Sequence, residues 1–366
     1  MRIMEVVSAR DINGVSVHCF LLTCELAKRG HDVTLLCRPG SWIAEQAADT
    51  PGITVEASNL ERWPLRELRR MADIARVRQI DVIHTHMTRA HNFGIFLQKI
   101  TGIPCIQTAH SHKVNPHWWL ADHIIAVSDV TRTYHLRYNR ISPHKIDTVH
   151  GFIDTSRFTP QQQDARNAVR TSLEISDDCF LLGVISDYLP RKGQIYLIQA
   201  LPKLIQTIPG IRLAMAGSIR TPAYYSKVRA SAKELGVEEY ILWLGQRRDI
   251  PDLLQALDLY LLVSLDEMFP VGALEAMAAG RPVIATSVGG TPECNAVPNS
   301  IYLIPPASPD SIAEAVLKLY SDKMQREALG RKGAETVRDH FSVERQTDCI
   351  ENVFTKVISS RKGGIS

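Results

Sequence analysis

Short apolar runs alternate with segments of helical apolar spacing, and this alternation occurs twice along the chain. The first set of runs is 2–7, 32–37, 82–85, 105–108 and 124–127, with helical spacing over 16–29. The second set is 180–186, 212–216, 241–244, 259–263 and 282–286. Short apolar strands separated by helices are typical of parallel sheets that are buried on both faces. The pattern therefore predicts an α/β fold with two Rossmann-like domains.

A polar stretch separates the two sets of runs. Residues 155–173 contain Pro160 and a run of glutamines, as expected for a linker. A chain of 366 residues is long enough for two domains of ordinary size. We therefore predict an N-terminal domain over residues 1–160 and a C-terminal domain over 161–343. The alternative is one large doubly wound sheet, which the marked linker disfavours.

Composition is that of an ordinary soluble protein, with 45% apolar and 22% charged residues. The net charge of +3 is too small to indicate a nucleic acid partner. No apolar run reaches the roughly 18 residues that span a bilayer, and residues 1–9 lack the layout of a signal peptide. The seven cysteines are scattered without a Cys-x-x-Cys pair, which argues against a zinc ribbon or a disulfide framework. These features predict a cytoplasmic protein.

Glu267 and Glu275 form the most informative pattern for function. Glu267 lies in a predicted loop with Pro270 and Gly272, and Glu275 lies in a helix predicted to end at Gly280. A helix amino terminus preceded by glycine offers N–H groups and a positive dipole end to an anion such as phosphate. A carboxylate one turn further along accepts hydrogen bonds from hydroxyls. Two glutamates at this spacing also occur by chance, but here one segment combines donors for phosphate with acceptors for sugar hydroxyls.

Further motifs accompany this pair and extend over nearly the whole chain. They are Phe269-Pro270, 280–282 and 289–293 near the glutamates, and 29–33, 81–86, 102–110, 121–128 and 145–154 in the first half. Together they resemble the retaining glycosyltransferases of family 4, the glycosyl transferases group 1. The resemblance implies the GT-B architecture, in which two Rossmann-like domains face a central cleft. The first domain would face the acceptor, the second would bind the donor, and a last helix over 344–361 would pack back on the first.

The activity that this resemblance implies is transfer of a sugar, of the hexosyl type, from a nucleoside diphosphate sugar to a hydroxyl acceptor with retention of configuration. The acceptor would be a glycan, a lipid-linked saccharide or a small molecule, as in polysaccharide biosynthesis. Three alternatives stay open: a sugar-nucleotide 2-epimerase, a phosphorylase and a non-catalytic sugar-nucleotide-binding subunit. Donor turnover with and without an acceptor separates the enzymes, and binding without turnover would indicate the subunit.

Individual residues also acquire roles from the resemblance. The expected catalytic residues are His110, Lys192 and Glu267. The expected donor-binding residues are Gly14, Arg191, Lys192, Arg247, Phe269, Pro270, Val271, Gly272 and Glu275. In this assignment Lys192 holds the diphosphate, Glu275 binds the ribose hydroxyls, and His110 contacts a hydroxyl of the transferred sugar.

Two positions depart from the family's pattern. Asp187 stands where the family usually has an arginine that binds the diphosphate together with the lysine. A carboxylate there would repel a phosphate, so the sequence predicts that Asp187→Arg tightens diphosphate binding and that Arg191 is a candidate for the missing charge. Asn13-Gly14 stands where the family usually has two glycines, and we expect a similar loop because asparagine tolerates a positive φ.

His84 and His86 alternate at the end of a predicted strand and so share one face of it. A metal site is one interpretation, but no third ligand with convincing spacing follows and no cysteine is near. We therefore expect no metal and no other cofactor. The leaving diphosphate would instead be stabilised by Lys192, by helix amino termini and by the Gly14 turn.

Residues 61–78 contain more arginines than acidic residues and a few apolar neighbours. A basic amphipathic segment can lie on anionic lipid, whereas a solvated helix face is the commoner explanation. The stretch is a candidate for peripheral contact with the inner face of a membrane.

Overall fold

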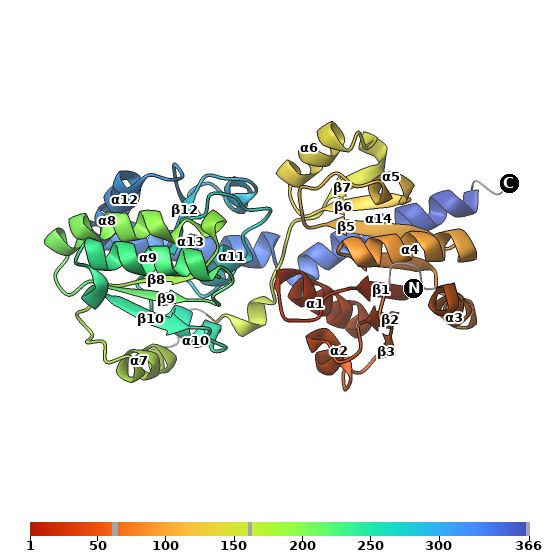
Figure 1. The fold of residues 1–366 in the computed structure, drawn as a ribbon, viewed down its shortest axis with the longest axis horizontal. Helices are drawn as coiled ribbons and strands as arrows, with labels where there is room; N and C mark the ends of the chain where they lie inside the picture. Colours follow the sequence, from red (N-terminus) through yellow and green to blue (C-terminus); the bar gives the residue numbers. More distant parts are fainter. Residues whose placement is uncertain (61–64, 160–162, 364–366) are drawn as a thin grey trace. The chain divides into compact units, whose positions relative to one another are not determined.

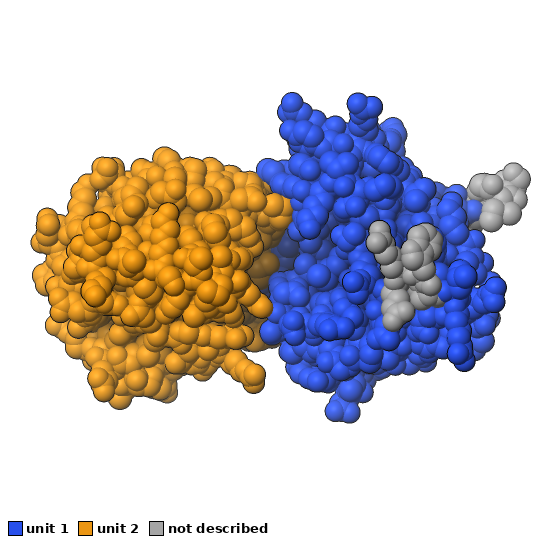
Figure 2. Space-filling view, viewed as in Figure 1, with its two compact units in different colours: residues 1–153, 343–366 blue, residues 154–342 orange. Residues whose placement is uncertain are grey.

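The chain forms two compact units in the computed structural model, which describes residues 1–60, 65–159 and 163–363 (Figure 2). Unit 1 consists of Met1–Ile153 and Val343–Ser366, and unit 2 consists of Asp154–Ser342. The division between the units falls after Ile153, just before the polar stretch. The sequence had predicted it after residue 160. Each unit has its own sheet, so the single-sheet alternative is wrong.

Unit 1 is built on a parallel sheet of seven strands in the order β3-β2-β1-β4-β5-β6-β7 (Figure 1). The strands are β1 (Arg2–Val7), β2 (Asp32–Cys37), β3 (Ile53–Ala57), β4 (Val82–His86), β5 (Cys105–Ala109), β6 (His123–Ala126) and β7 (Ile146–Thr148). The helices are α1 (Gly14–Lys28), α2 (Trp42–Ala47), α3 (Leu65–Val77), α4 (Thr88–Thr101), α5 (His117–Leu120), α6 (Asp129–Tyr138) and α14 (Val343–Gly363), with the short turn η1 (Pro143–Lys145).

Helices cover both faces of this sheet, which explains why its central strands are buried almost throughout. Ile3 packs with Leu22 of α1 and Phe354 of α14, whereas its neighbour Met4 packs with Met71 of α3 on the opposite face. Successive strand residues point to opposite faces, so a strand covered on both sides has no polar alternation. The last helix, α14, is thus part of the core of unit 1 although it follows unit 2 in the chain.

Unit 2 contains a parallel sheet of six strands in the order β10-β9-β8-β11-β12-β13. The strands are β8 (Leu181–Ile185), β9 (Arg212–Ala216), β10 (Ile241–Gly245), β11 (Leu259–Leu262), β12 (Val283–Thr286) and β13 (Tyr302–Ile304). The helices are α7 (Gln163–Ser172), α8 (Gln194–Thr207), α9 (Pro222–Glu234), α10 (Ile250–Ala256), α11 (Val271–Ala278), α12 (Pro309–Ser321) and α13 (Lys323–His340). Short 3-10 turns are η2 (Thr155–Arg157), η3 (Pro190–Lys192), η4 (Glu238–Tyr240) and η5 (Thr291–Cys294).

Both sheets reverse their winding direction at one point. In unit 1 the chain runs outward from β1 to β3 and then returns to β4 on the other side of β1. In unit 2 it runs outward from β8 to β10 and then returns to β11 beside β8. Loops at the carboxyl ends of the two strands that flank such a switch point diverge and leave a crevice where open α/β sheets bind ligands. The switch points therefore lie between β1 and β4 and between β8 and β11.

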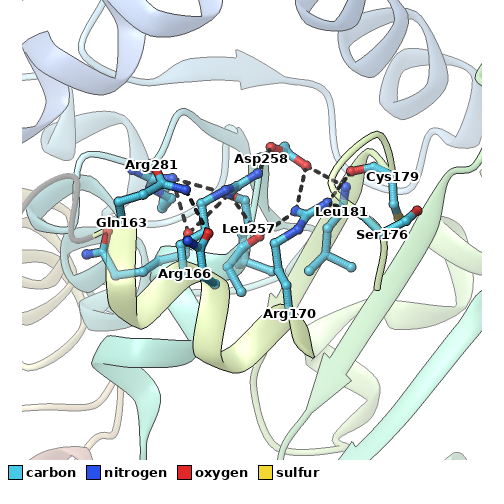
Figure 3. A network of polar contacts seen from close by, with 12 residues as sticks. Gln163, Arg166, Arg170, Ser176, Cys179, Leu181, Leu257, Asp258 and Arg281 are labelled. Carbon is cyan, nitrogen blue, oxygen red and sulfur yellow. Dashed lines mark hydrogen bonds and ion pairs between the residues drawn. The ribbon is translucent and has the colours of Figure 1, made fainter. Parts of the chain in front are cut away.

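Part of the predicted linker is helical. Helix α7 is attached to unit 2 mainly by charge, since Arg166 and Arg170 both pair with Asp258 and donate to backbone carbonyls such as that of Ala256 (Figure 3). Arg281 joins the same network through the carbonyl of Leu257. A polar sequence can hide a packed helix when arginine side chains, rather than an apolar stripe, bind it to the domain. Residues 160–162 of the predicted linker lie outside the described residues.

Candidate functional site

Lys192 and Glu267 meet across the switch point of unit 2. Lys192 ends the loop that follows β8, and Glu267 lies in the loop that follows β11. The Lys192 Nζ atom lies 2.5 Å from Glu267 Oε1, and Ser264 donates a hydrogen bond of 2.6 Å to the same oxygen. Glu267 is buried and Lys192 is largely buried. The carboxylate and the ammonium group are therefore held in one place before any ligand arrives.

Glycines let the loops around this pair approach one another. Gly289 has a φ of +50°, and a Cβ there would lie 1.8 Å from the carbonyl oxygen of Glu267. The N–H of Gly290 donates to that same oxygen at 2.9 Å. Gly193 has a φ of +67°, and its Cβ would lie 2.1 Å from the carbonyl oxygen of Val263. Only glycine fits these contacts, so Gly193 and Gly289 help to fix the position of the Lys192–Glu267 pair.

Glu275 lies in α11, whose amino end follows directly after the Glu267 loop. Burial raises the pKa of Glu275 to about 7, against the opposing influence of the Arg157 charge. None of the described residues forms a hydrogen bond with its carboxylate. Burial, with Glu275 and Glu267 nearby, also raises the pKa of Tyr260, whose hydroxyl would lie 2.9 Å from a Cβ at Gly272. Glu275 is thus a partly buried carboxyl group that is poised to change its protonation state near neutral pH.

Two helix amino ends accompany these side chains. Helix α8 begins after Gly193, where the Tyr224 hydroxyl accepts from the N–H of Ile195 at 3.3 Å, and α11 begins after Pro270, whose side chain forms no cap hydrogen bond. An amino end without a side-chain cap, as at α11, keeps backbone N–H groups available for an anion. The switch point of unit 2 therefore combines one ammonium group, two helix amino ends and two carboxyl groups.

The other predicted donor-site residues differ in how near they lie to the Lys192–Glu267 pair. Arg191 is exposed and lies 3.5 Å from Glu267 Oε2, beside the pair. Phe269 and Pro270 are buried, and the Phe269 ring packs on Phe341, so these side chains shape the loop. Arg247 follows β10, two strands from β8, and forms an ion pair with Asp249. Arg247 thus follows a strand two positions away in the sheet from the strand that precedes Lys192.

Asp187 is engaged within its own unit. Its carboxylate accepts a hydrogen bond of 3.1 Å from the backbone N–H of Ser218 and forms an ion pair of 3.1 Å with Arg220 Nε. Ser218 and Arg220 belong to the loop after β9. The expectation of a repelling carboxylate assumed an unpaired group. In the structure Asp187 joins two loops and brings a guanidinium group next to the position of the missing arginine.

Gly14 and Asn13 differ from the sequence expectation. Asn13 has a φ of −158° and is the N-cap of α1, where its side chain accepts from the N–H groups of Val15 and Ser16. A Cβ at Gly14 would meet no atom within 4 Å. Asn13 therefore does not use the positive φ that asparagine tolerates, because it acts as a helix cap.

Histidines gather at the switch point of unit 1, around Glu5 of β1. Glu5 is fully buried and its carboxylate contacts His84 Nδ1 at 2.9 Å and His86 Nε2 at 3.0 Å. His86 Nδ1 lies 3.2 Å from Nε2 of His110, which follows β5. The ring of His18, from α1, lies 4.8 Å from the His110 ring. The predicted site residue His110 is thus one member of a buried cluster.

Electrostatics favour neutral rings for His18, His86 and His110 around the ionised carboxylate of Glu5. Burial would raise the pKa of Glu5, but its contacts with His84 and His86 lower it to about 2. Burial lowers the pKa of His86 to about 4, and it lowers the pKa of His18 and of His110 well below the usual value. Glu5 and His18 were missed from the sequence. A glutamate inside an otherwise apolar strand was the available signal, because an unpaired buried carboxylate is too costly to occur without partners.

Other hollows lie away from the switch points. A cavity of about 760 Å³ is lined by Arg281, Arg326, Arg331 and Arg338 near the amino ends of β11 and β12. The basic stretch includes α3, where Arg70 pairs with Glu67 and Arg76 pairs with Asp73; residues 61–64 lie outside the described residues. Within the described part of the chain, the helices are too short or too polar to cross a membrane.

The fold and the site define a class of protein: two parallel-sheet α/β units with a lysine, helix amino ends and carboxyl groups at a switch point are the framework of a GT-B glycosyltransferase. Family models agree with this. Glycosyltransferase Family 4 matches residues 12–157 and Glycosyl transferases group 1 matches residues 165–336. The chain belongs to these glycosyltransferases.

Named relatives are similar over nearly the whole chain. N-acetyl-α-D-glucosaminyl L-malate synthase of Bacillus anthracis is 25% identical over 93% of this chain and 93% of its own length. D-inositol 3-phosphate glycosyltransferase of Saccharomonospora viridis is 24% identical over 98% of this chain and 93% of its own length. These alignments place the chain among glycosyltransferases without fixing its substrates.

Solved structures share the fold. The structure of Anabaena HepE in complex with UDP and glucose has a TM-score of 0.84 and 19% identity, and the match covers 97% of this chain and 100% of that chain. A glycosyltransferase from Rickettsia africae has a TM-score of 0.86 and 19% identity over 98% of this chain and 99% of that chain. The GT-B fold predicted from the sequence is thereby confirmed.

Proposed function

We propose that the protein transfers a sugar from a nucleoside diphosphate sugar to a hydroxyl group, with retention of configuration. The observation that carries this proposal is the Lys192–Glu267 pair at the switch point, next to the amino ends of α8 and α11. HepE is described with UDP and glucose. The malate and inositol 3-phosphate in the relatives' names are hydroxyl-bearing molecules, which supports a hydroxyl acceptor.

In this proposal the diphosphate leaves with the electron pair of the bond to the anomeric carbon. Lys192 and the amino ends of α8 and α11 stabilise the negative charge that develops on it, and no metal is required. Glu275 accepts hydrogen bonds from the ribose hydroxyls, and Glu267 supports positive charge at the anomeric carbon while it orients Lys192. His110 contacts a hydroxyl of the sugar.

Retention follows from attack on the face that the diphosphate leaves. The acceptor oxygen forms the new bond to the anomeric carbon, and its proton passes to an oxygen of the departing diphosphate. A two-step route would need a carboxylate nucleophile at that carbon. Glu267, the carboxylate nearest to Lys192, is committed to Lys192 and Ser264, so the single-displacement route is the better candidate.

A thermal-shift screen of UDP, GDP, ADP and their diphosphate sugars tests the binding step. A ligand at 100 times its dissociation constant adds about 2.7 kcal/mol of stability. We expect one nucleotide to stabilise the wild type and to lose its effect in Lys192→Ala, with Arg338→Ala in the distant arginine-lined cavity as the control. If no nucleoside diphosphate or its sugar stabilises the protein, the proposal is wrong.

Donor turnover distinguishes the proposal from its alternatives. A transferase consumes donor only with a hydroxyl acceptor, an epimerase releases nucleotide without one, and a phosphorylase requires inorganic phosphate. Binding without any turnover would favour a non-catalytic subunit. Peripheral membrane contact through the basic stretch is a separate prediction, and flotation with anionic lipid vesicles would check it.

A further inference from the structure

We propose that His18, His86 and His110 form a binding site for one transition-metal cation of the zinc class. The three residues come from α1, from the end of β4 and from the residue after β5, all at the carboxyl edge of the unit 1 sheet. Their potential ligand atoms lie within 4.8 Å of one another. This site goes beyond the proposed function, which uses no metal ion, although both involve His110.

The spacing of the rings fits a tetrahedral ion. With metal–nitrogen bonds of about 2.0 Å, neighbouring ligand nitrogens lie about 3.3 Å apart and ring centroids about 5 Å apart. His86 Nδ1 and His110 Nε2 lie 3.2 Å apart. The centroid distances are 4.8 Å for His18–His110, 5.5 Å for His86–His110 and 5.6 Å for His18–His86. Modest side-chain rotations therefore suffice to bring all three nitrogens onto one ion.

Glu5 fixes which nitrogen of His86 can bind an ion. Its carboxylate accepts a hydrogen bond from His86 Nε2 at 3.0 Å, so the proton of the neutral ring is on Nε2. The lone pair is then on Nδ1, the atom that faces His110. A carboxylate behind a histidine ligand is a recurrent feature of zinc sites, because it sets the tautomer and raises the basicity of the ligand. His84 is not a ligand in this arrangement, since its nitrogens contact Glu5 and Thr108.

His18 supplies an independent indication of a missing partner. Its side chain is 7% exposed, and its Nε2 atom has no hydrogen-bond partner among the described residues. An unsatisfied buried nitrogen costs free energy unless something binds it. The ring is held in place against Phe152, with centroids 4.2 Å apart. His110 is partly exposed, which leaves a path for an ion.

Three imidazole nitrogens and no oxygen ligand select the class of ion. Such sites suit Zn²⁺ and its neighbours Co²⁺, Ni²⁺ and Cu²⁺, whereas Mg²⁺ and Ca²⁺ prefer oxygen ligands. We therefore expect binding of Zn²⁺ but not of Mg²⁺ at comparable concentrations.

The experiment measures ion binding directly and does not depend on sugar transfer. EDTA-treated, dialysed protein is titrated with ZnCl₂ against a chromophoric chelator, with MgCl₂ as the control ion. We expect one tight Zn²⁺ site per chain, and His18→Phe and His110→Gln should each weaken it at least roughly tenfold. Phenylalanine keeps the packing on Phe152 and removes the ligand nitrogen. His123→Gln, a buried histidine outside the cluster, should retain the site.

Two results would overturn the proposal: a wild-type protein without a tight site, or variants that bind Zn²⁺ as well as the wild type does. X-ray absorption on the zinc-loaded protein should show three imidazole ligands at about 2.0 Å. A different ligand count or a sulfur ligand would also refute the assignment. If His18→Phe does not fold, His110→Gln decides, since His110 is the least buried of the three. If the wild-type protein binds no nucleotide in unit 2, the proposed function is wrong, but the proposal of a zinc site is unaffected.

Discussion

Lys192 Nζ lies 2.5 Å from Glu267 Oε1, with the two residues on loops that leave neighbouring strands of the unit 2 sheet. The contact joins the only two charged residues to which the sequence assigned catalytic roles. It also means that neither residue can be changed without altering the surroundings of the other. A diphosphate that binds to Lys192 must share this cation with a carboxylate already present, which makes the pair sensitive to substitution.

The first prediction concerns this pair. Lys192→Met leaves the buried Glu267 carboxylate with only the exposed Arg191 as a cation, so we expect it to lower the free energy of unfolding by about 3–5 kcal/mol and to abolish nucleotide binding. Adding Glu267→Gln should recover much of the stability without restoring turnover. Urea unfolding and calorimetric titration of the single and double variants measure both effects. If the double variant is as unstable as Lys192→Met, the two side chains are not coupled as described.

Glu275 gives a pH dependence to donor binding. Its pKa of about 7 means that the carboxyl is mostly protonated at pH 6 and mostly ionised at pH 8. Ribose hydroxyls donate better to the ionised form, so affinity for a nucleoside diphosphate sugar should rise roughly tenfold over this range. A diphosphate sugar has no terminal phosphate that titrates near neutrality. Glu275→Gln should bind more weakly and with a flat pH profile, whereas a wild-type profile in this variant would contradict the assignment.

The variant Asp187→Arg distinguishes the prediction made from the sequence, which is tighter diphosphate binding, from the prediction made from the structure. Since the carboxylate accepts from Ser218 and pairs with Arg220, we expect Asp187→Arg to lower the free energy of unfolding by about 1–3 kcal/mol and not to tighten diphosphate binding. Arg220→Ala, which removes only the cation, should have a smaller effect on stability. Tighter binding in Asp187→Arg would instead support a carboxylate that faces the phosphate.

Chelation tests whether transfer needs an ion. We expect activity to persist in excess EDTA, because Lys192 and the helix amino ends supply the positive charge in the proposed mechanism. His18→Phe serves as the comparison, since it should lack the proposed zinc site and respond to EDTA as the wild type does. Complete loss of wild-type activity, with recovery on adding one kind of divalent ion, would show a metal-dependent reaction.

Buried histidines predict a loss of stability in acid. Burial lowers the pKa of His86, His117 and His135 to about 4, below the unfolded value of about 6.5. The unfolded chain therefore takes up more protons, and stability falls as the pH decreases from about 6.5 to 4. Each such histidine contributes about 3 kcal/mol to this loss at pH 4.

Urea unfolding at several pH values between 7.5 and 5 measures this effect. His117→Phe should reduce the slope of stability against pH by removing one of the titrating groups. Exposed His144→Gln is the matched control and should leave the slope unchanged. A stability that is independent of pH in this range would mean that the buried histidines do not keep low pKa values.

The sequence determined the fold class because its central strands are buried on both faces. β1 and β2 were predicted with their observed bounds, since each is a mostly apolar run of six residues. β3, β7 and β13 were missed because they are short or partly exposed strands at or near a sheet edge. Helix α7 was taken for a linker because arginine contacts, and not an apolar face, attach it to unit 2.

The sequence also proposed Lys192, Glu267, Glu275 and His110 as site residues, since motifs around loops and strand ends are local. Only the tertiary structure decided which of them meet. Lys192 and Glu267 are 75 positions apart and come together because β8 and β11 are neighbours at a switch point. The histidine cluster likewise draws on α1, β4 and the end of β5. Parallel sheets align the ends of strands that are distant in the chain, and a local sequence pattern does not predict which strands are neighbours.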